Sequence, residues 1–146
     1  MSESSTLPHK TTLEVRDTCL CLHLQRAARA IARRFDETFR PLGLTNGQFS
    51  ILMSLNRPEP PMMGDVARLL ALDRTTLTAN LKPLERRGLV EVTPDSADRR
   101  SRRLKLTGEG KELLARAYPA WREAHAEIDR LLADPDRLRA ELLRLT

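Results

Sequence analysis

Residues 71–110, ALDRTTLTANLKPLERRGLVEVTPDSADRRSRRLKLTGEG, are the stretch that decides the fold. Asp73 is a good helix N-cap, because its carboxylate can accept hydrogen bonds from the free N–H groups of a first turn. Gly88 is typical of a helix end, because glycine readily adopts the left-handed conformation that closes many helices. These two signals predict a helix over residues 74–87.

This helix has two contrasting faces. Leu77, Leu81 and Leu84 recur at i, i+4 and i+7, the spacing of one apolar face that packs on a core. The outer face carries hydroxyl, methyl and cationic groups: Arg74, Thr75, Thr76, Thr78, Ala79, Lys82 and Arg86. Such a face suits a DNA major groove, where small residues allow close approach and hydroxyls bond base edges or phosphates. Taken alone, it is equally consistent with a solvated surface helix.

The second half of the stretch predicts a β-hairpin with a basic tip. Residues 89–93 and 103–107 alternate apolar and polar side chains, which is the period of half-buried strands. The turn-rich segment between them places four arginines at the tip: Arg99, Arg100, Arg102 and Arg103. Arginine enters a narrow, electronegative minor groove well. The alternative is a disordered charged loop, which agrees less well with two matching strand patterns.

Helix and hairpin together closely resemble the MarR family of transcriptional regulators. The resemblance rests on LERRGLVE, on Asp98-Arg99-Arg100, on Leu104-Lys105-Leu106-Thr107 and on Gly110, and it extends over about residues 21–132. It implies a winged helix-turn-helix dimer. In that arrangement Arg100 at the wing tip reaches the minor groove, and Asp98 helps to hold that arginine in place.

The composition bounds the class of protein. With 146 residues, 40% of them hydrophobic, the chain can form one compact domain or a small domain with dimerisation helices. The net charge of +5 permits nucleic-acid binding, while 3% aromatic residues give few platforms for stacking single-stranded bases. The sequence contains neither an apolar run of about 20 residues nor the apolar core of a signal peptide. We therefore expect a cytoplasmic protein with no membrane partner.

Four segments follow along the chain. Residues 1–11 are interpreted as a flexible arm, and residues 12–44 as a first helix that serves dimerisation. Its segment from Cys19 to Leu24 is apolar all round, which indicates burial by a second protomer. Residues 45–107 form the winged helix-turn-helix domain, and residues 108–146 form C-terminal dimerisation helices. The fold class expected is mainly α with a small β-hairpin.

The helix-turn-helix order is visible in the middle of the chain. Thr45 and Gln48 make a capping box that starts one helix, and the sequence RPEPP at residues 57–61 stops it. A short helix over residues 63–71 then leads into the helix predicted over residues 74–87, which is the recognition helix of this motif. Pro83 lies inside the recognition helix and removes its hydrogen bond to Ala79. Either the resulting kink tilts the helix toward DNA, or it is tolerated without a role.

Thr107 is a good N-cap for a long helix that runs toward residue 133, with a bend at Pro119. Asp134 and Pro135 begin a short last helix. The apolar stripes of both helices are too narrow for a core of their own. We therefore assign them, with the first helix, to a dimer interface.

Cys19, Cys21 and His23 raise the question of a metal or redox site. On one helix Cys19 and Cys21 would point about 200° apart, so they could not share an ion. Cys19 and His23 supply only two ligands, so we expect no metal and no cofactor. The resemblance places Cys21 near the reactive thiol of the organic-hydroperoxide-sensing branch, although Gln25 stands where that branch has a tyrosine. Cys21 is therefore either a redox sensor or an inert buried thiol.

An enzyme is not expected. The histidines His9, His23 and His125 have no spacing that indicates a catalytic triad, and no Gly-rich phosphate loop is present. A winged-helix module that binds only other proteins is the remaining alternative. It would not need four arginines at the wing, and steep salt dependence of DNA binding would exclude it.

The sequence therefore predicts a homodimeric, sequence-specific double-stranded DNA-binding transcriptional regulator, interpreted as a repressor. Major-groove contacts fall to the outer face of the recognition helix, Arg100 enters the minor groove, and Arg86 and Arg102 bind phosphates. The two-fold symmetry predicts a pseudo-palindromic operator. The resemblance implies release by a small, often phenolic or amphipathic effector bound between the dimer helices and the winged domain. Phe49, Met53 and Trp121 are the candidate effector-binding residues.

Overall fold

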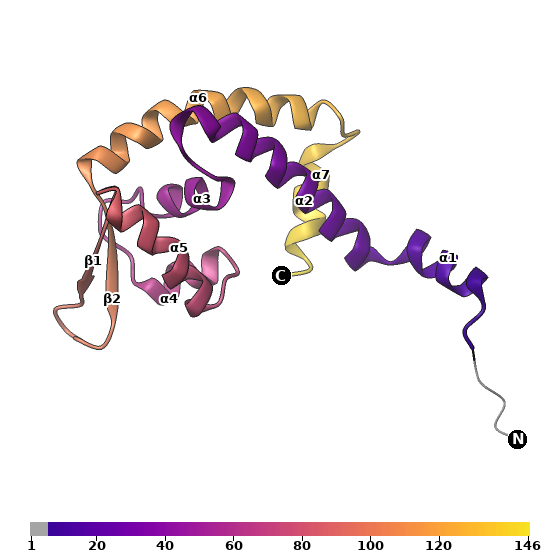
Figure 1. Ribbon diagram of the computed structural model, residues 1–146, viewed down its shortest axis with the longest axis horizontal. Coiled ribbons are helices and arrows are strands. Elements are labelled where there is room, and N and C mark those ends of the chain that lie inside the picture. The colour runs from indigo at the N-terminus through magenta and orange to yellow at the C-terminus, as the bar shows by residue number, and fades with distance from the viewer. Residues whose placement is uncertain (1–5) are drawn as a thin grey trace, which may run out of the picture. The chain divides into compact units, whose positions relative to one another are not determined.

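The computed structural model describes residues 6–146 and is shown in Figure 1. The chain divides between Arg34 and Phe35 into two compact units. The first unit holds helix α1 (His9–Thr18) and the first part of α2 (Leu20–Phe39). The second holds the end of α2 and all later elements. Residues 1–5 of the expected arm lie outside the described residues.

The first unit differs from the single long helix expected from about residue 12. The chain is already helical from His9, and it breaks at Cys19, whose φ of −67° and ψ of 108° are extended. Asp17, Thr18 and Cys19 are three consecutive weak helix formers, and an acidic side chain at a helix C-terminus opposes the helix dipole. The Thr18 hydroxyl also donates to the Glu14 carbonyl at 2.7 Å. These local preferences explain why the helix is interrupted here.

The second unit contains the helix-turn-helix and the hairpin. Its elements after α2 are the 3₁₀ helix η1 (Arg40–Leu42), α3 (Asn46–Ser54), α4 (Met63–Leu69), α5 (Arg74–Arg86), β1 (Val90–Pro94), β2 (Arg102–Leu106), α6 (Gly108–Asp129) and α7 (Pro135–Leu143). Figure 1 shows α3, α4 and α5 grouped beside the hairpin, with α6 leading away from β2. The predicted order of helix, turn, recognition helix and hairpin is confirmed, with strand ends shifted by one residue.

Three predicted caps are present. Thr45 forms the expected capping box with Gln48, and the Asp73 carboxylate accepts from the Thr76 N–H at 2.7 Å. Thr107 accepts from the Gly110 N–H and donates to the Gly88 carbonyl at 2.6 Å. The helix-turn-helix turn uses Ala71 in the left-handed region, with φ of 52°. These short-range bonds set where α3, α5 and α6 begin.

One apolar core holds the second unit together. The leucine face of α5 is buried as predicted, with Leu77, Leu81 and Leu84 at most 1% exposed. Leu104 and Leu106 of β2 lie beside it in the same core. The strands pair antiparallel, with Val90 opposite Leu106 and Val92 opposite Leu104. The hairpin is therefore attached to the helices through one face of its strands.

Candidate nucleic-acid interface

A surface groove lies between α5 and the hairpin, and it brings together most of the side chains predicted to contact DNA. It is lined by Met63, Arg74, Thr75, Thr78, Ala79, Lys82 and Arg100. Six of these seven residues were predicted from the sequence, and Met63 is the addition. Among the described residues the lining contains three cations and no carboxylate. The groove is therefore positively charged and open to an anionic ligand.

The outer face of α5 is presented because its opposite face is fixed in the core. Thr75, Thr78, Ala79 and Lys82 are all exposed. The Thr78 hydroxyl donates to the Arg74 carbonyl at 2.8 Å. This bond commits the hydroxyl proton to the helix and leaves the rest of the side chain at the surface.

Thr76 has a different environment from the other predicted side chains of α5. Its hydroxyl donates to Asp73 Oδ2 at 3.0 Å, and it does not line the groove. Hydrogen bonds from the backbone and side chain of Thr76 lower the pKa of Asp73. Thr76 therefore strengthens the cap of the recognition helix. Arg86 is also exposed and outside the groove lining.

The turn of the hairpin is shaped by Asp98. Its Oδ1 accepts from the Arg100 backbone N–H at 3.1 Å, and its Oδ2 accepts from the Ser101 hydroxyl at 3.1 Å. The expectation was that Asp98 holds Arg100 in place, and the bond found is to the main chain of that residue. The Arg100 side chain is exposed and lines the groove. Arg102 donates instead to the Arg99 carbonyl at 2.7 Å.

Arg103 differs from the other arginines expected at the basic tip, because its side chain is bound within the protein. Its Nε donates to Asp95 Oδ1 at 2.6 Å, and its Nη1 donates to the Pro60 carbonyl at 2.7 Å. The side-chain hydrogen bond from Arg103 is the main reason that the pKa of Asp95 is lowered. Arg103 is thus an anchor at the end of the strands next to the hairpin turn. The signal missed in the sequence is a carboxylate just after β1 with an arginine eight residues later in β2, which a hairpin brings together.

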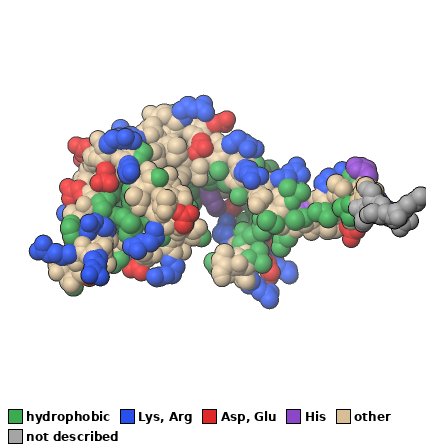
Figure 2. All heavy atoms as spheres, turned by 60° about the horizontal axis from the view of Figure 1, so that its bottom comes forward, with side chains coloured by type: hydrophobic (Ala, Val, Ile, Leu, Met, Phe, Trp, Pro, Cys, Tyr) green, Lys and Arg blue, Asp and Glu red, His purple; other side chains and the backbone are tan. Residues whose placement is uncertain are grey.

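Figure 2 shows Lys and Arg side chains gathered over the part of the second unit that carries the hairpin.

Arg87 also has a structural role, because its Nη1 donates to the Gly43 carbonyl at 2.6 Å. Gly43 has a positive φ of 67° at the end of η1. This bond attaches the C-terminus of the recognition helix to the turn that follows α2.

The candidate effector residues lie elsewhere in the second unit, and two of them are in an aromatic cluster. Phe49 is 7% exposed, and its ring centroid is 4.5 Å from that of Phe39 and 6.4 Å from that of Trp121. Trp121 stacks on His125 at 4.8 Å. Met53 is 41% exposed and is not part of this stacked cluster.

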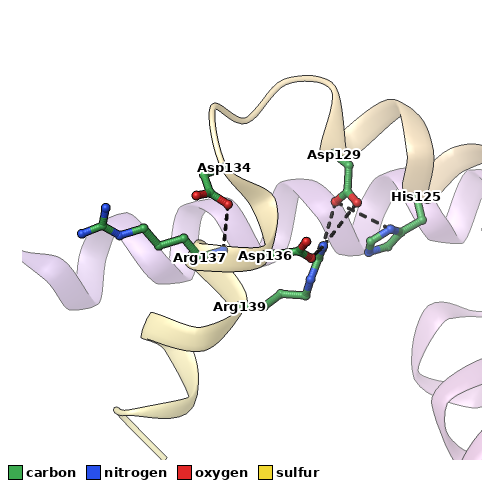
Figure 3. Close-up of polar contacts among 6 residues, drawn as sticks. All are labelled: His125, Asp129, Asp134, Asp136, Arg137 and Arg139. Carbon is green, nitrogen blue, oxygen red and sulfur yellow. Dashed lines mark hydrogen bonds and ion pairs between the residues drawn. The ribbon is translucent and has the colours of Figure 1, made fainter.

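His125 also connects the cluster to the C-terminal helix. His125 Nδ1 lies 3.7 Å from Asp129 Oδ1, and Arg139 Nη1 donates to the same oxygen at 2.9 Å (Figure 3). Arg139 also pairs with Asp136 at 2.6 Å. Hydrogen bonds to Asp129 and then to Asp136 raise the pKa of Arg139. These contacts hold α7 against the end of α6.

The two cysteines do not lie on one continuous helix, which corrects the expectation from the sequence. Cys19 occupies the extended break and is half-buried, whereas Cys21 is in α2 and exposed. The expectation that they point about 200° apart on a continuous helix is therefore wrong. Within a single protomer Cys21 is exposed, whereas the inert alternative requires a buried thiol. Within residues 6–146 no group of three or more His, Cys, Asp or Glu residues is placed to hold a metal ion.

Comparison with known proteins identifies the family. Residues 44–101 match the model of the MarR family. The transcriptional activatory protein BadR of Rhodopseudomonas palustris is 34% identical over 75% of this chain and 65% of BadR, so the match spans less than two thirds of that protein. The transcriptional regulator MosR of M. tuberculosis, in a crystal structure with DNA, is 38% identical, covers 87% of this chain and 92% of MosR, and gives a TM-score of 0.80. This chain belongs to the MarR family.

A further structural neighbour is CouR from Rhodococcus jostii RHA1, whose crystal structure contains p-coumaroyl-CoA. It is 25% identical, covers 88% of this chain and 90% of CouR, and has a TM-score of 0.73. The predicted fold class, mainly α with a small hairpin, is confirmed by the two-stranded sheet and by these neighbours. No described helix of this MarR-family chain is long and apolar enough to cross a membrane.

Proposed function

We propose that this chain is a transcriptional regulator that binds a specific site on double-stranded DNA through the groove between α5 and the hairpin. The observation that carries the proposal is the convergence of Arg74 and Lys82 from α5 with Arg100 from the hairpin around one groove. Small exposed side chains, Thr75 and Ala79, lie between these cations on the helix. Cations bind phosphates, and small residues allow a helix to approach base edges.

In the proposed complex, the outer face of α5 lies in the major groove and Arg100 enters the adjacent minor groove. Arg102 and Arg86 then contact phosphates on either side, and Asp98 fixes the turn that presents Arg100. The DNA complex of MosR, which is 38% identical to this chain, supports this assignment. We also propose that the regulator is cytoplasmic and is not an enzyme, and the description of the relatives BadR and PecS as transcriptional regulators supports the second point.

The regulator is proposed to act as a homodimer. In the second unit, Leu131, Leu143 and Leu145 are between 58% and 75% exposed, and in the first unit Val15 and Leu20 are more than half exposed. Large apolar side chains exposed on these helices favour cover by another protein surface. Residues 12–44 and 108–146 are therefore assigned to dimerisation, and residues 45–107 to DNA binding. Two-fold symmetry then requires a pseudo-palindromic operator with half-sites about one helical turn apart.

Repression relieved by a small-molecule effector is the proposed mode of regulation. The stacked cluster around Phe49 and Trp121 offers planar rings, which suits an aromatic ligand. CouR, bound to p-coumaroyl-CoA, is a neighbour with such a ligand. Met53 remains a candidate contact at the surface. Phe49 itself is a core residue, so only a ligand that displaces packed rings would reach it.

A thiol-based redox-sensing repressor is the second candidate. The observation in its favour is that Cys21 is exposed and that Cys19, two residues before it, lies in non-helical backbone. Exposure gives an oxidant access to the thiol. Loss of DNA binding under peroxide that is restored by a thiol reductant, and that is absent in Cys21→Ser, would establish it.

The test of the proposal is a fluorescence-anisotropy titration of the protein against duplex DNA at several salt concentrations. DNA binding through phosphate contacts predicts that log K falls linearly with log salt, with a slope of about −0.9 per phosphate neutralised. A sequence-specific regulator must also bind one duplex much more tightly than shuffled competitors. Absence of binding at low salt would contradict the proposal and favour the winged-helix module that binds proteins.

A further inference from the structure

We infer that Ala79 determines part of the operator sequence by contacting the methyl group of a thymine in the major groove. This inference rests on the proposed DNA-binding function and adds which base the groove reads. It follows from the chemistry of the groove lining, which limits the hydrogen bonds that the groove can make.

The lining of the groove lacks the side chains that are specific for two of the four bases. Adenine is read in the major groove by Asn or Gln, and cytosine by Asp or Glu. Among the described residues none of these four types lines the groove. Asn80, the only carboxamide of α5, is exposed but outside the lining. Direct readout through the groove is therefore left to guanine, by Arg or Lys, to thymine, through its methyl group, and to single hydrogen bonds of Thr75 and Thr78, which do not by themselves distinguish the bases.

Ala79 lies at the centre of the face that would approach the bases. Leu77, Leu81 and Leu84 are buried, and at 100° per residue Ala79 points almost directly away from their stripe. Ala79 is exposed, with Thr75 and Lys82 on the same face. The side chain that comes closest to the floor of the major groove is therefore a single methyl group. Ala and Thr methyl groups are suitable partners for the thymine methyl.

Thr78 and Met63 make the same part of the groove more apolar. The Thr78 hydroxyl donates to the Arg74 carbonyl, and it lies 3.9 Å from Met63 Sδ, so its proton is not available to a base. The three cations belong to Arg74, Lys82 and Arg100, two on α5 and one on the hairpin. The groove thus combines an apolar centre with cationic neighbours, which fits thymine methyls at the centre and guanine or phosphates beside them.

The test begins with in vitro selection of a tight-binding duplex from random sequence. Each thymine of the selected half-sites is then replaced, one at a time, by deoxyuridine, which removes only the methyl group. We expect one or two positions at which this change weakens binding about fourfold, the effect of one buried methyl group. At such a position Ala79→Gly should lose the discrimination, so that thymine and uracil duplexes bind this variant equally.

Asn80→Gly is the matched control, because it introduces the same helix-weakening residue at an exposed position outside the groove. It should retain the fourfold preference for thymine. If no deoxyuridine substitution changes affinity, or if Ala79→Gly keeps the full preference, the inference is overturned although specific binding stands. If selection yields no preferred duplex at all, the proposed function itself fails.

Discussion

Arg103 Nε lies 2.6 Å from Asp95 Oδ1, and this ion pair ties the two ends of the wing turn together. The same guanidinium donates to the Pro60 carbonyl, and the Leu104 N–H donates to the Pro61 carbonyl at 2.9 Å. The Asp95 side chain is only 8% exposed. The turn end of the hairpin is therefore attached to the loop that precedes α4, which fixes the position of Arg100 relative to the helices.

Arg103→Gln should lower DNA affinity without changing its salt dependence. Without this ion pair the wing must become ordered when DNA binds. The free-energy cost is about that of immobilising one side chain, which is roughly a fivefold loss of affinity. Because Arg103 is engaged within the protein, the number of phosphates neutralised stays the same. Arg102→Gln is the matched comparison and should lower both the affinity and the salt slope. A reduced salt slope for Arg103→Gln would mean that Arg103 contacts phosphate directly.

The ion pair between Asp95 and Arg103 should persist in mild acid. Arg103 lowers the pKa of Asp95, so the ionised form stabilises the folded state at every pH above the unfolded pKa of about 4. The contribution is lost only as the pH falls through the lower pKa of the folded state. Denaturant titrations of wild type and Asp95→Asn should therefore differ by a constant free energy from pH 7 to 5. A difference that already shrinks over that range would contradict this role.

Gly110→Ala should destabilise the second unit. A Cβ at Gly110 would lie 2.3 Å from the Leu89 carbonyl oxygen and 2.7 Å from Leu106 Cδ1, so α6 would have to move away from the hairpin. Overpacking of this kind costs about 1–3 kcal/mol. Gly108→Ala is the control, because nothing lies within 4 Å of its Cβ. Thermal melts should show a lower Tm only for Gly110→Ala, and an equal effect of both variants would refute the close-packing argument.

Pro83→Ala should change operator affinity more than it changes fold stability. Pro83 is half-buried within α5 and supplies no N–H to the Ala79 carbonyl, which belongs to a residue of the groove lining. Alanine would restore that hydrogen bond and straighten the part of the helix that faces DNA. Parallel binding titrations and melts measure both effects. A lower Tm with unchanged binding would show that the proline has no role in recognition.

The features predicted correctly from the sequence are those set by neighbouring residues. Thr45, Asp73 and Thr107 cap helices through bonds to residues three positions away, and the leucine stripe of α5 follows from helical periodicity alone. The sequence does not predict the break at Cys19, because the apolar pattern continues across it. A continuous apolar pattern carries more weight in such a prediction than the weak helix formers Asp17 and Thr18. The pairing of Arg103 with Pro60 joins residues 43 positions apart, and no local pattern reports such a contact.

The most direct test of the account is a hydroxyl-radical footprint of the protein on the DNA upstream of its own gene, compared with Arg100→Ala. Wild type should protect two half-sites about one helical turn apart, with minor-groove protection flanking each of them. Arg100→Ala should keep the dimer and the central major-groove contacts but lose the flanking protection. Identical footprints for both proteins, or no protected site for either, would contradict the assignment of this groove and wing to DNA.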